Sequence, residues 1–247
     1  MKAGRGFTLI ELLVVLGVVA ALVAISLPVL GSSREASRQL RCLAHIRSAG
    51  HRLALYSNDH REALPFGPWA RETREIEPIG TITWGGGMMY IGGRWSYHFP
   101  EEWAGGRWSR GMQCPEQSRR HDPMSPNWWE NQSTPMYEMS RAVWEDQRNL
   151  AQDSGPDFSF PLTPHRLGDV AFPSLKGYLA EFPMLCTTDP KARFWQELGQ
   201  TQGFPSSVQF FDGSAQRLRL SDGIQAPIMS PVLVTVGGIR GRDFHSR

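Results

Sequence analysis

The chain has 247 residues and a formal net charge of +2. That near balance gives no electrostatic footprint for nucleic acid or for anionic membranes, so neither is indicated as a partner. The 18 prolines, 25 glycines and nine tryptophans indicate a loop-rich exterior domain with short strands.

The first notable feature is an apolar run from Phe7 to Leu27, interrupted by one carboxylate, Glu11. At a helical rise of about 1.5 Å per residue this run spans about 30 Å, the thickness of a bilayer's hydrocarbon layer. It is too long for an ordinary secretory signal. The basic residues before it, Lys2 and Arg5, predict that the N-terminus stays cytoplasmic while the rest crosses. Ionisable groups in a membrane helix indicate function, although a simple anchor that tolerates Glu11 is the plainer alternative.

The residues Gly6-Phe7-Thr8-Leu9-Ile10-Glu11-Leu12 resemble the processing motif of type IV pilins and of the pseudopilins of type II secretion. The resemblance implies that a prepilin peptidase cleaves between Gly6 and Phe7 and methylates the new N-terminus. It also implies that Glu11 meets the N-terminal amine of a neighbouring subunit during assembly. In a low-dielectric core each charge offsets the burial penalty of the other, which fixes the register of the helices.

After the apolar run, Pro28 and Gly31 are expected to interrupt and kink the helix. A second, amphipathic helix is expected from about Ser33 to Asn58, with Ser32 and Ser33 offering its cap. The two segments would form one long, bent helical spine. Its expected apolar face contains Ala36, Leu40, Leu43, Ile46 or Arg47, Gly50, Leu53 and Tyr56.

A second resemblance follows from Arg34-Glu35-Ala36-Ser37-Arg38, Cys42, Leu64-Pro65 and Cys114-Pro115. These residues resemble a large pilin-like family abundant in planctomycete-type bacteria. A disulfide between Cys42 and Cys114 would tie the spine helix to the sheet domain and, by closing about 70 residues, would stabilise by roughly 2–4 kcal/mol. The alternative is that both cysteines are reduced and buried.

Residues 66–110 are rich in glycine and tryptophan. The glycines lack the spacing of a phosphate-binding loop, which favours ordinary turns. The tryptophans either fill a small core or form a platform for stacking a ligand such as a carbohydrate.

Strands are expected at Met136–Ser140, at Gly177–Phe182 and in a hairpin over Val208–Leu218 with an Asp212-Gly213 turn. The hairpin resembles the C-terminal element of the second family, with Ser214 replacing its usual histidine. The fold class expected is α+β: a long bent N-terminal helix packed on a small antiparallel sheet, with irregular Gly/Trp/Pro-rich insertions.

The seven histidines lack metal-ligand spacing, and no catalytic motif occurs. Asp212 and Asp222 near the hairpin could contribute to calcium binding, but turn chemistry alone explains a turn aspartate. No enzyme activity, cofactor or metal is therefore expected.

The boundaries expected are a leader over 1–6, a membrane and assembly helix over 7–30, a spine helix over 31–60 and an exterior domain over 61–247. The favoured interpretation is a pilin-like filament subunit in the inner membrane with a periplasmic domain. The prepilin peptidase and other pilin-like subunits are its partners. A membrane-anchored binding module with a pilin-type leader is the second hypothesis, and an anchored exterior enzyme is the third.

Overall fold

The computed structural model describes residues 8–65, 73–77, 80–83, 95–96, 98–104, 107–112, 137–144, 163–181, 205–219, 222–224, 232, 235 and 237–245. The chain divides into two compact units, residues 1–40 and residues 41–247. One long helix, α1 (Leu9–Asp59), begins in the first unit and ends in the second.

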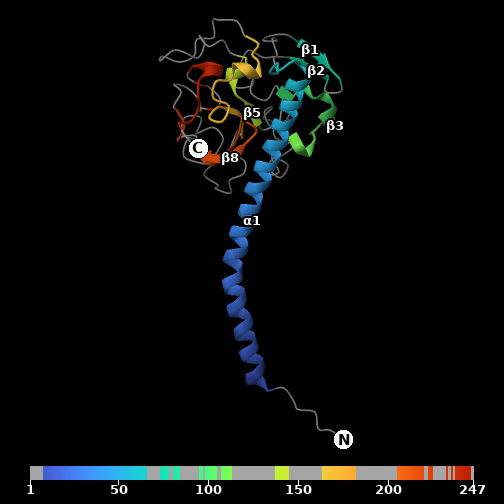
Figure 1. Cartoon of the computed structure of the whole chain (residues 1–247). Coiled ribbons are helices and arrows are strands. Elements are labelled where there is room, and N and C mark those ends of the chain that lie inside the picture. The colour runs from blue at the N-terminus through green and yellow to red at the C-terminus, as the bar shows by residue number, and fades with distance from the viewer. Residues whose placement is uncertain are drawn as a thin grey trace. The chain divides into compact units, whose positions relative to one another are not determined.

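In the first unit α1 is uninterrupted, so the expected break after Leu27 is wrong. The helix includes Pro28 and Gly31, and neither serine that follows caps a new helix. Proline lacks the N–H that would bond the Ala24 carbonyl, and its ring crowds that carbonyl, which usually costs about 3 kcal/mol. The long helical runs on both sides keep the axis continuous, and over residues 9–40 Figure 1 shows a gently curving ribbon.

In the second unit, residues 41–59 of α1 pack against the sheet through one stripe of side chains. The buried members recur every three or four residues, as a helix face requires: Cys42, Ile46, Ala49, Leu53 and Ser57. The expected stripe was right at Ile46 and Leu53 and wrong at Leu40, which is 67% exposed. The true contact face therefore begins only at Cys42.

The helix approaches the sheet closely at Gly50. A Cβ atom added there would clash with the side-chain amide of Gln209, so glycine permits this packing distance. Nearby, Arg47 donates a hydrogen bond to the carbonyl of Ala215 over 3.3 Å.

The C-terminus of α1 closes with a Schellman-type turn. The N–H of Glu62 donates to the carbonyl of Ser57 at 2.7 Å. Arg61 and Glu62 have φ angles of 56° and 65°, in the left-handed region that glycine usually occupies at this position. The chain then pairs with a distant segment, because Leu64 N–H donates to His165 O at 2.9 Å and Leu167 N–H donates to Glu62 O at 2.9 Å.

The central sheet has four antiparallel strands in the order β5-β6-β7-β8. They are β5 (Tyr137–Met139), β6 (Gly177–Glu181), β7 (Pro205–Phe210) and β8 (Ala215–Arg219). These strands confirm the expected strands and hairpin. In the β7–β8 turn Gly213 has a φ of 82°, and Asp212 Oδ1 accepts hydrogen bonds from Ser214 N–H at 3.0 Å and Ser214 Oγ at 2.6 Å. The α+β architecture expected from the sequence is confirmed.

Both faces of the sheet are covered. Residues 41–59 of α1 and the larger core cluster lie on one face, where Leu179 and Met139 are buried. Side chains of β6 and β7 form a second cluster with the C-terminal segment: Ala180, Val208, Phe210, Val232 and Phe244. Every residue of β6 is consequently buried, although a one-sided sheet would show alternation.

Two short hairpins accompany the sheet: β1 (Thr73–Ile76) with β2 (Gly80–Thr83), and β3 (Trp103–Ala104) with β4 (Arg107–Trp108). The described 3-10 turns are η3 (Pro100–Glu102), η4 (Arg110–Met112), η5 (Arg141–Val143), η7 (Leu167–Asp169) and η10 (Gly238–Arg240). An ion pair of 2.6 Å between Arg52 Nε and Glu102 Oε1 joins α1 to η3.

Candidate functional site

The first described residues form a capping box at the start of α1. Thr8 Oγ1 accepts a hydrogen bond from the Glu11 N–H at 3.3 Å. In return Glu11 Oε2 accepts bonds of 2.8 Å from both the N–H and the hydroxyl of Thr8. This exchange satisfies donors that a helix start leaves without partners. Gly6 and Phe7, the expected cleavage residues, lie outside the described residues.

The capping role of Glu11 was missed from the sequence, although the pattern Thr-x-x-Glu before an apolar run is its usual signature. The Glu11 side chain is also exposed. Its carboxylate is therefore accessible to a cation from outside the chain while it holds its own helix start. The structure describes a single chain, so the expected contact with a neighbouring subunit stays a prediction.

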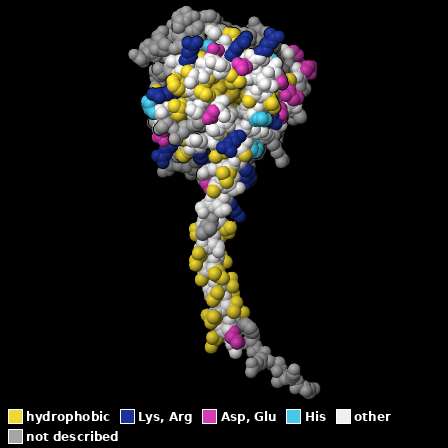
Figure 2. All heavy atoms as spheres, viewed as in Figure 1, with side chains coloured by type: hydrophobic (Ala, Val, Ile, Leu, Met, Phe, Trp, Pro, Cys, Tyr) yellow, Lys and Arg dark blue, Asp and Glu magenta, His cyan; other side chains and the backbone are white. Residues whose placement is uncertain are grey.

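The residues that follow Glu11 present an apolar surface with no cover in the chain. Leu9, Ile10 and Ile25 are 85%, 76% and 69% exposed, and hydrophobic side chains clothe the visible face of this part of α1 in Figure 2. Among the described residues α1 is the one helix long and apolar enough to cross a membrane, judged by length and composition. An apolar surface of this extent on a helix requires lipid or other helices around it.

Cys42 lies further along α1, at the start of the face that packs on the sheet. Its side chain is fully buried and disulfide-bonded. The chain has two other cysteines, Cys114 and Cys186, and both lie outside the described residues. The disulfide thus tethers α1 to a part of the chain that the sequence places far downstream.

Aromatic and histidine side chains gather where α1 ends. Tyr56 stacks on His60 with ring centroids 3.9 Å apart, and His98 meets Tyr56 edge-on at 5.0 Å. Burial, helped by the nearby charge of His60, lowers the pKa of His98 to about 4. Within the described part of the chain no three His, Cys, Asp or Glu side chains form a metal-binding group. Asp212, considered for calcium, uses its carboxylate in the hairpin turn.

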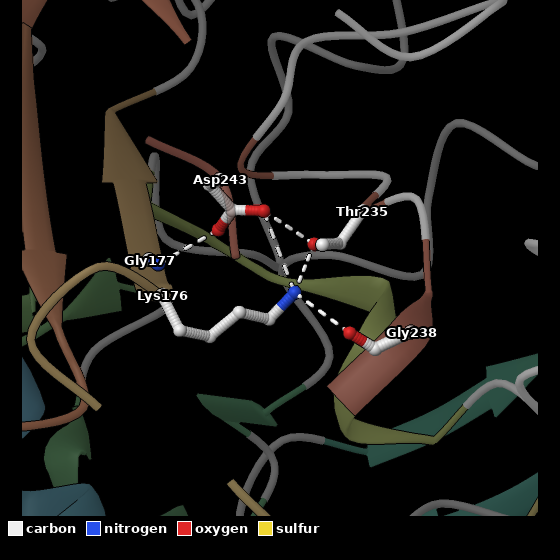
Figure 3. Close-up of polar contacts among 5 residues, drawn as sticks. All are labelled: Lys176, Gly177, Thr235, Gly238 and Asp243. Atoms are coloured by element: carbon white, nitrogen blue, oxygen red, sulfur yellow. Dashed lines mark hydrogen bonds and ion pairs between the residues drawn. The ribbon is translucent and has the colours of Figure 1, made fainter. Parts of the chain in front are cut away.

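A buried polar cluster that the sequence analysis did not anticipate fixes the C-terminal segment beside β6 (Figure 3). Lys176 Nζ donates to the hydroxyl of Thr235, to the carbonyl of Gly238 at 3.1 Å and to Oδ1 of Asp243 at 3.4 Å. Asp243 Oδ2 accepts from the Gly177 N–H at 2.7 Å, and the Thr235 hydroxyl donates to Oδ1 at 2.5 Å. Lys176 is fully buried and Asp243 is 1% exposed. Hydrogen-bonded pairs of this kind commonly support a fold.

The tryptophans divide between described and undescribed positions. Trp95 is 1% exposed and donates its indole N–H to the Tyr137 carbonyl at 2.8 Å. It is therefore a core residue, which is the first of the two alternatives expected for the tryptophans. Trp103 and Trp108 are backbone partners in the register of β3 and β4. Trp69 and Trp84 lie outside the described residues, and the ligand platform stays a hypothesis.

Residues 1–27 match the family described as the prokaryotic N-terminal methylation motif. No curated protein and no solved structure matches the chain. The matched stretch contains the capping box and nearly all of the uncovered apolar surface. The motif and the long helix indicate a type IV pilin-like protein, a class whose members are usually non-enzymatic structural subunits.

Proposed function

We propose that this chain is a pilin-like or pseudopilin subunit that assembles through α1 into a type IV pilus-like or type II secretion filament. A prepilin peptidase first cleaves it between Gly6 and Phe7 and methylates Phe7. The observation that carries the proposal is that the methylation motif over residues 1–27 includes most of an uncovered apolar helix surface. Assembly would bury that surface against like helices.

The proposed arrangement has four parts: a leader over 1–6, a membrane and assembly segment over 7–30, a spine segment over 31–60 and an exterior domain over 61–247. The N-terminus lies in the cytoplasm, the segment crosses the inner membrane and the domain is periplasmic. The apolar side chains of the second part support this assignment, since they are exposed in the single chain. The burial of Cys42, Ile46 and Leu53 supports the assignment of the spine segment.

Within the filament we assign Glu11 to the N-terminal amine of the neighbouring subunit. The exposed carboxylate supports this role, and its bonds to Thr8 hold it in a defined rotamer before assembly. An amine and a carboxylate that meet in a low-dielectric bundle each relieve the other's burial penalty.

The test combines intact-mass measurement with a filament-incorporation assay. Expression with a prepilin peptidase should remove six residues and add one methyl group. Glu11→Ala and Glu11→Gln should both be processed but left out of filaments, since neither can pair with an amine by charge. Glutamine keeps the reach of the capping box, so its failure would assign the defect to charge and not to a frayed helix.

Glu101→Gln is the matched control, because Glu101 is an exposed carboxylate in η3, and it should assemble normally. An uncut chain would overturn the proposal in favour of a plain anchor. A cut chain whose Glu11 variants assemble as well as the control would favour the second hypothesis, a membrane-anchored binding module with a pilin-type leader.

We further propose that the disulfide partner of Cys42 is Cys114, which lies in the Cys-Pro element of the planctomycete-type pilin-like family that the chain resembles. Cys42 is disulfide-bonded, which leaves Cys114 and Cys186 as candidates. Cys114→Ser should release a free Cys42 thiol and lower the free energy of unfolding by about 2–4 kcal/mol. Cys186→Ser should leave both the Cys42 disulfide and the free energy of unfolding unchanged. Non-reducing peptide mapping reads the pairing directly, and a Cys42–Cys186 peptide would refute it.

A further inference from the structure

Two arginines lie on one side of α1 immediately after its apolar surface ends. Leu30 is 52% exposed and is the last large apolar side chain of the uncovered run. Arg34 and Arg38 follow it, four residues apart, so their side chains project within about 40° of each other around the helix. Arg34 is exposed, and the Arg38 side chain is 27% exposed.

The height of these arginines along the helix fits the headgroup layer of a bilayer. At about 1.5 Å per residue Arg34 lies about 6 Å beyond Leu30 and about 35 Å beyond Glu11. The hydrocarbon layer is about 30 Å thick, and each headgroup layer adds about 5–7 Å. Side chains on a helix lean toward its N-terminus, which here is toward the membrane. Arg38, about 12 Å beyond Leu30, can therefore also reach back toward the headgroups.

Glu35, the acidic residue between the two arginines, makes its side-chain contacts with other residues of α1. Glu35 Oε2 lies 3.5 Å from Arg38 Nη1, and Glu35 Oε1 accepts a hydrogen bond from Gln39 Nε2 at 3.2 Å. Two arginines against this one glutamate leave residues 31–40 with a net positive charge of +1. The Glu35 carboxylate therefore offsets part of the Arg38 charge, and Arg34 is the more exposed arginine of the two.

We infer that Arg34 and Arg38 bind phosphate groups of anionic phospholipids in the leaflet that faces the globular domain. This inference rests on the proposed membrane span of α1. The guanidinium group offers paired N–H donors that match phosphate oxygens, and it desolvates more readily than an ammonium group. The contact would set the depth of the helix in the membrane before assembly, and it must break when the subunit is withdrawn into a filament.

The experiment titrates the detergent-solubilised full-length chain with short-chain phosphatidylglycerol and counts bound lipid by native mass spectrometry. The variant R34Q/R38Q should bind phosphatidylglycerol at least about fivefold more weakly at low salt. R34K/R38K keeps the positive charge but loses the paired N–H donors. Its affinity for phosphatidylglycerol should therefore lie between that of the unaltered chain and that of R34Q/R38Q. The control R219Q/R240Q removes two exposed arginines of the globular domain and should match the unaltered chain. Phosphatidylcholine and inorganic phosphate should bind all forms weakly and alike.

Equal phosphatidylglycerol affinity for the unaltered chain and R34Q/R38Q would overturn the inference. An equal loss in R219Q/R240Q would overturn it as well, because the effect would then follow net charge. Both outcomes differ from a failure of the proposed function, because R34Q/R38Q keeps the leader and Glu11 and is cleaved by the peptidase if the chain is a pilin-like subunit. A chain that fails to enter phospholipid nanodiscs would refute the membrane span and this inference together.

Discussion

Glu11 and Thr8 exchange hydrogen bonds at the start of α1. The Glu11 carboxylate therefore caps its own helix and is also proposed to bind the N-terminal amine of a neighbouring subunit. In the single chain its Oε2 atom accepts two hydrogen bonds from Thr8. A neighbour's amine could share that carboxylate without freeing it from the cap, because a carboxylate has about four lone-pair sites. The internal bonds also limit the rotamer freedom that would otherwise be lost on assembly.

Another residue-scale effect is expected at His98, whose folded-state pKa is about 4 against an ordinary 6.5. Between these values the unfolded chain takes up a proton that the folded chain excludes. The free energy of unfolding should therefore fall as the pH drops from 6.5 toward 4, by about 2–3 kcal/mol from this group. Urea unfolding of the unaltered chain and of His98→Asn should show this pH dependence shrinking in the variant.

His245→Asn is the matched control for this measurement, since His245 is exposed, and it should keep the full pH dependence. His60 and Tyr56 are the ring neighbours of His98, and His60 contributes to the lowered pKa. A variant His98→Asn with the same pH profile as the unaltered chain would contradict the assignment.

At the scale of elements, the C-terminus of α1 contains a correctable strain. Arg61 occupies a left-handed conformation with φ of 56°. A side chain there costs about 1 kcal/mol that glycine does not incur. Arg61→Gly should raise the free energy of unfolding by about that amount in chemical denaturation. Arg219→Gly, at an exposed position in the extended strand β8, removes the same charge and should lower it. A loss of stability at both positions would contradict this account of the helix end.

Several elements could be predicted from local sequence, and others could not. The β7–β8 hairpin was readable because Asp212-Gly213 joins two β-rich runs, and the end of α1 was readable near Asn58. The continuity of α1 through Pro28 was not, because propensity argues for a break and the length of the helix on both sides overrides it. Leu40 was assigned to the buried face on spacing alone, yet the sheet meets α1 only from Cys42 onward.

On the scale of the whole molecule, the buried pair Lys176–Asp243 fixes the C-terminal segment to β6. Lys176→Met would leave the Asp243 carboxylate buried with only Thr235 and Gly177 as donors. Removing one partner of a buried pair should lower the free energy of unfolding by about 3–5 kcal/mol. The double variant Lys176→Met/Asp243→Leu should lose less than Lys176→Met alone, because no buried charge remains. Chemical denaturation of both variants tests this, and a double variant that loses as much stability as Lys176→Met or more would refute the coupling.

This pair was out of reach of sequence reading, because nothing local marks two residues 67 positions apart as partners. The candidate assembly site was readable for the opposite reason, since Gly6, Phe7 and Glu11 form one short contiguous motif. The capping role of Thr8 was present in the same letters and was overlooked. Arg34 and Arg38 were visible in the sequence, but the net charge of +2 gave no reason to single them out, because a sum over the chain averages away a local group of charges.

The two-sided covering of the sheet bears on how the protein is made. Residues from Cys42 to Ser57 cover one face, and the other face and its polar cluster require Phe244 and Asp243. A ribosome makes Cys42 to Ser57 long before it makes Asp243 and Phe244. The central strands therefore lack their second cover until Phe244 has been made. If the domain is exported behind its membrane segment, with the N-terminus kept in the cytoplasm, it would cross the membrane unfolded and finish folding only after Asp243 and Phe244 emerge.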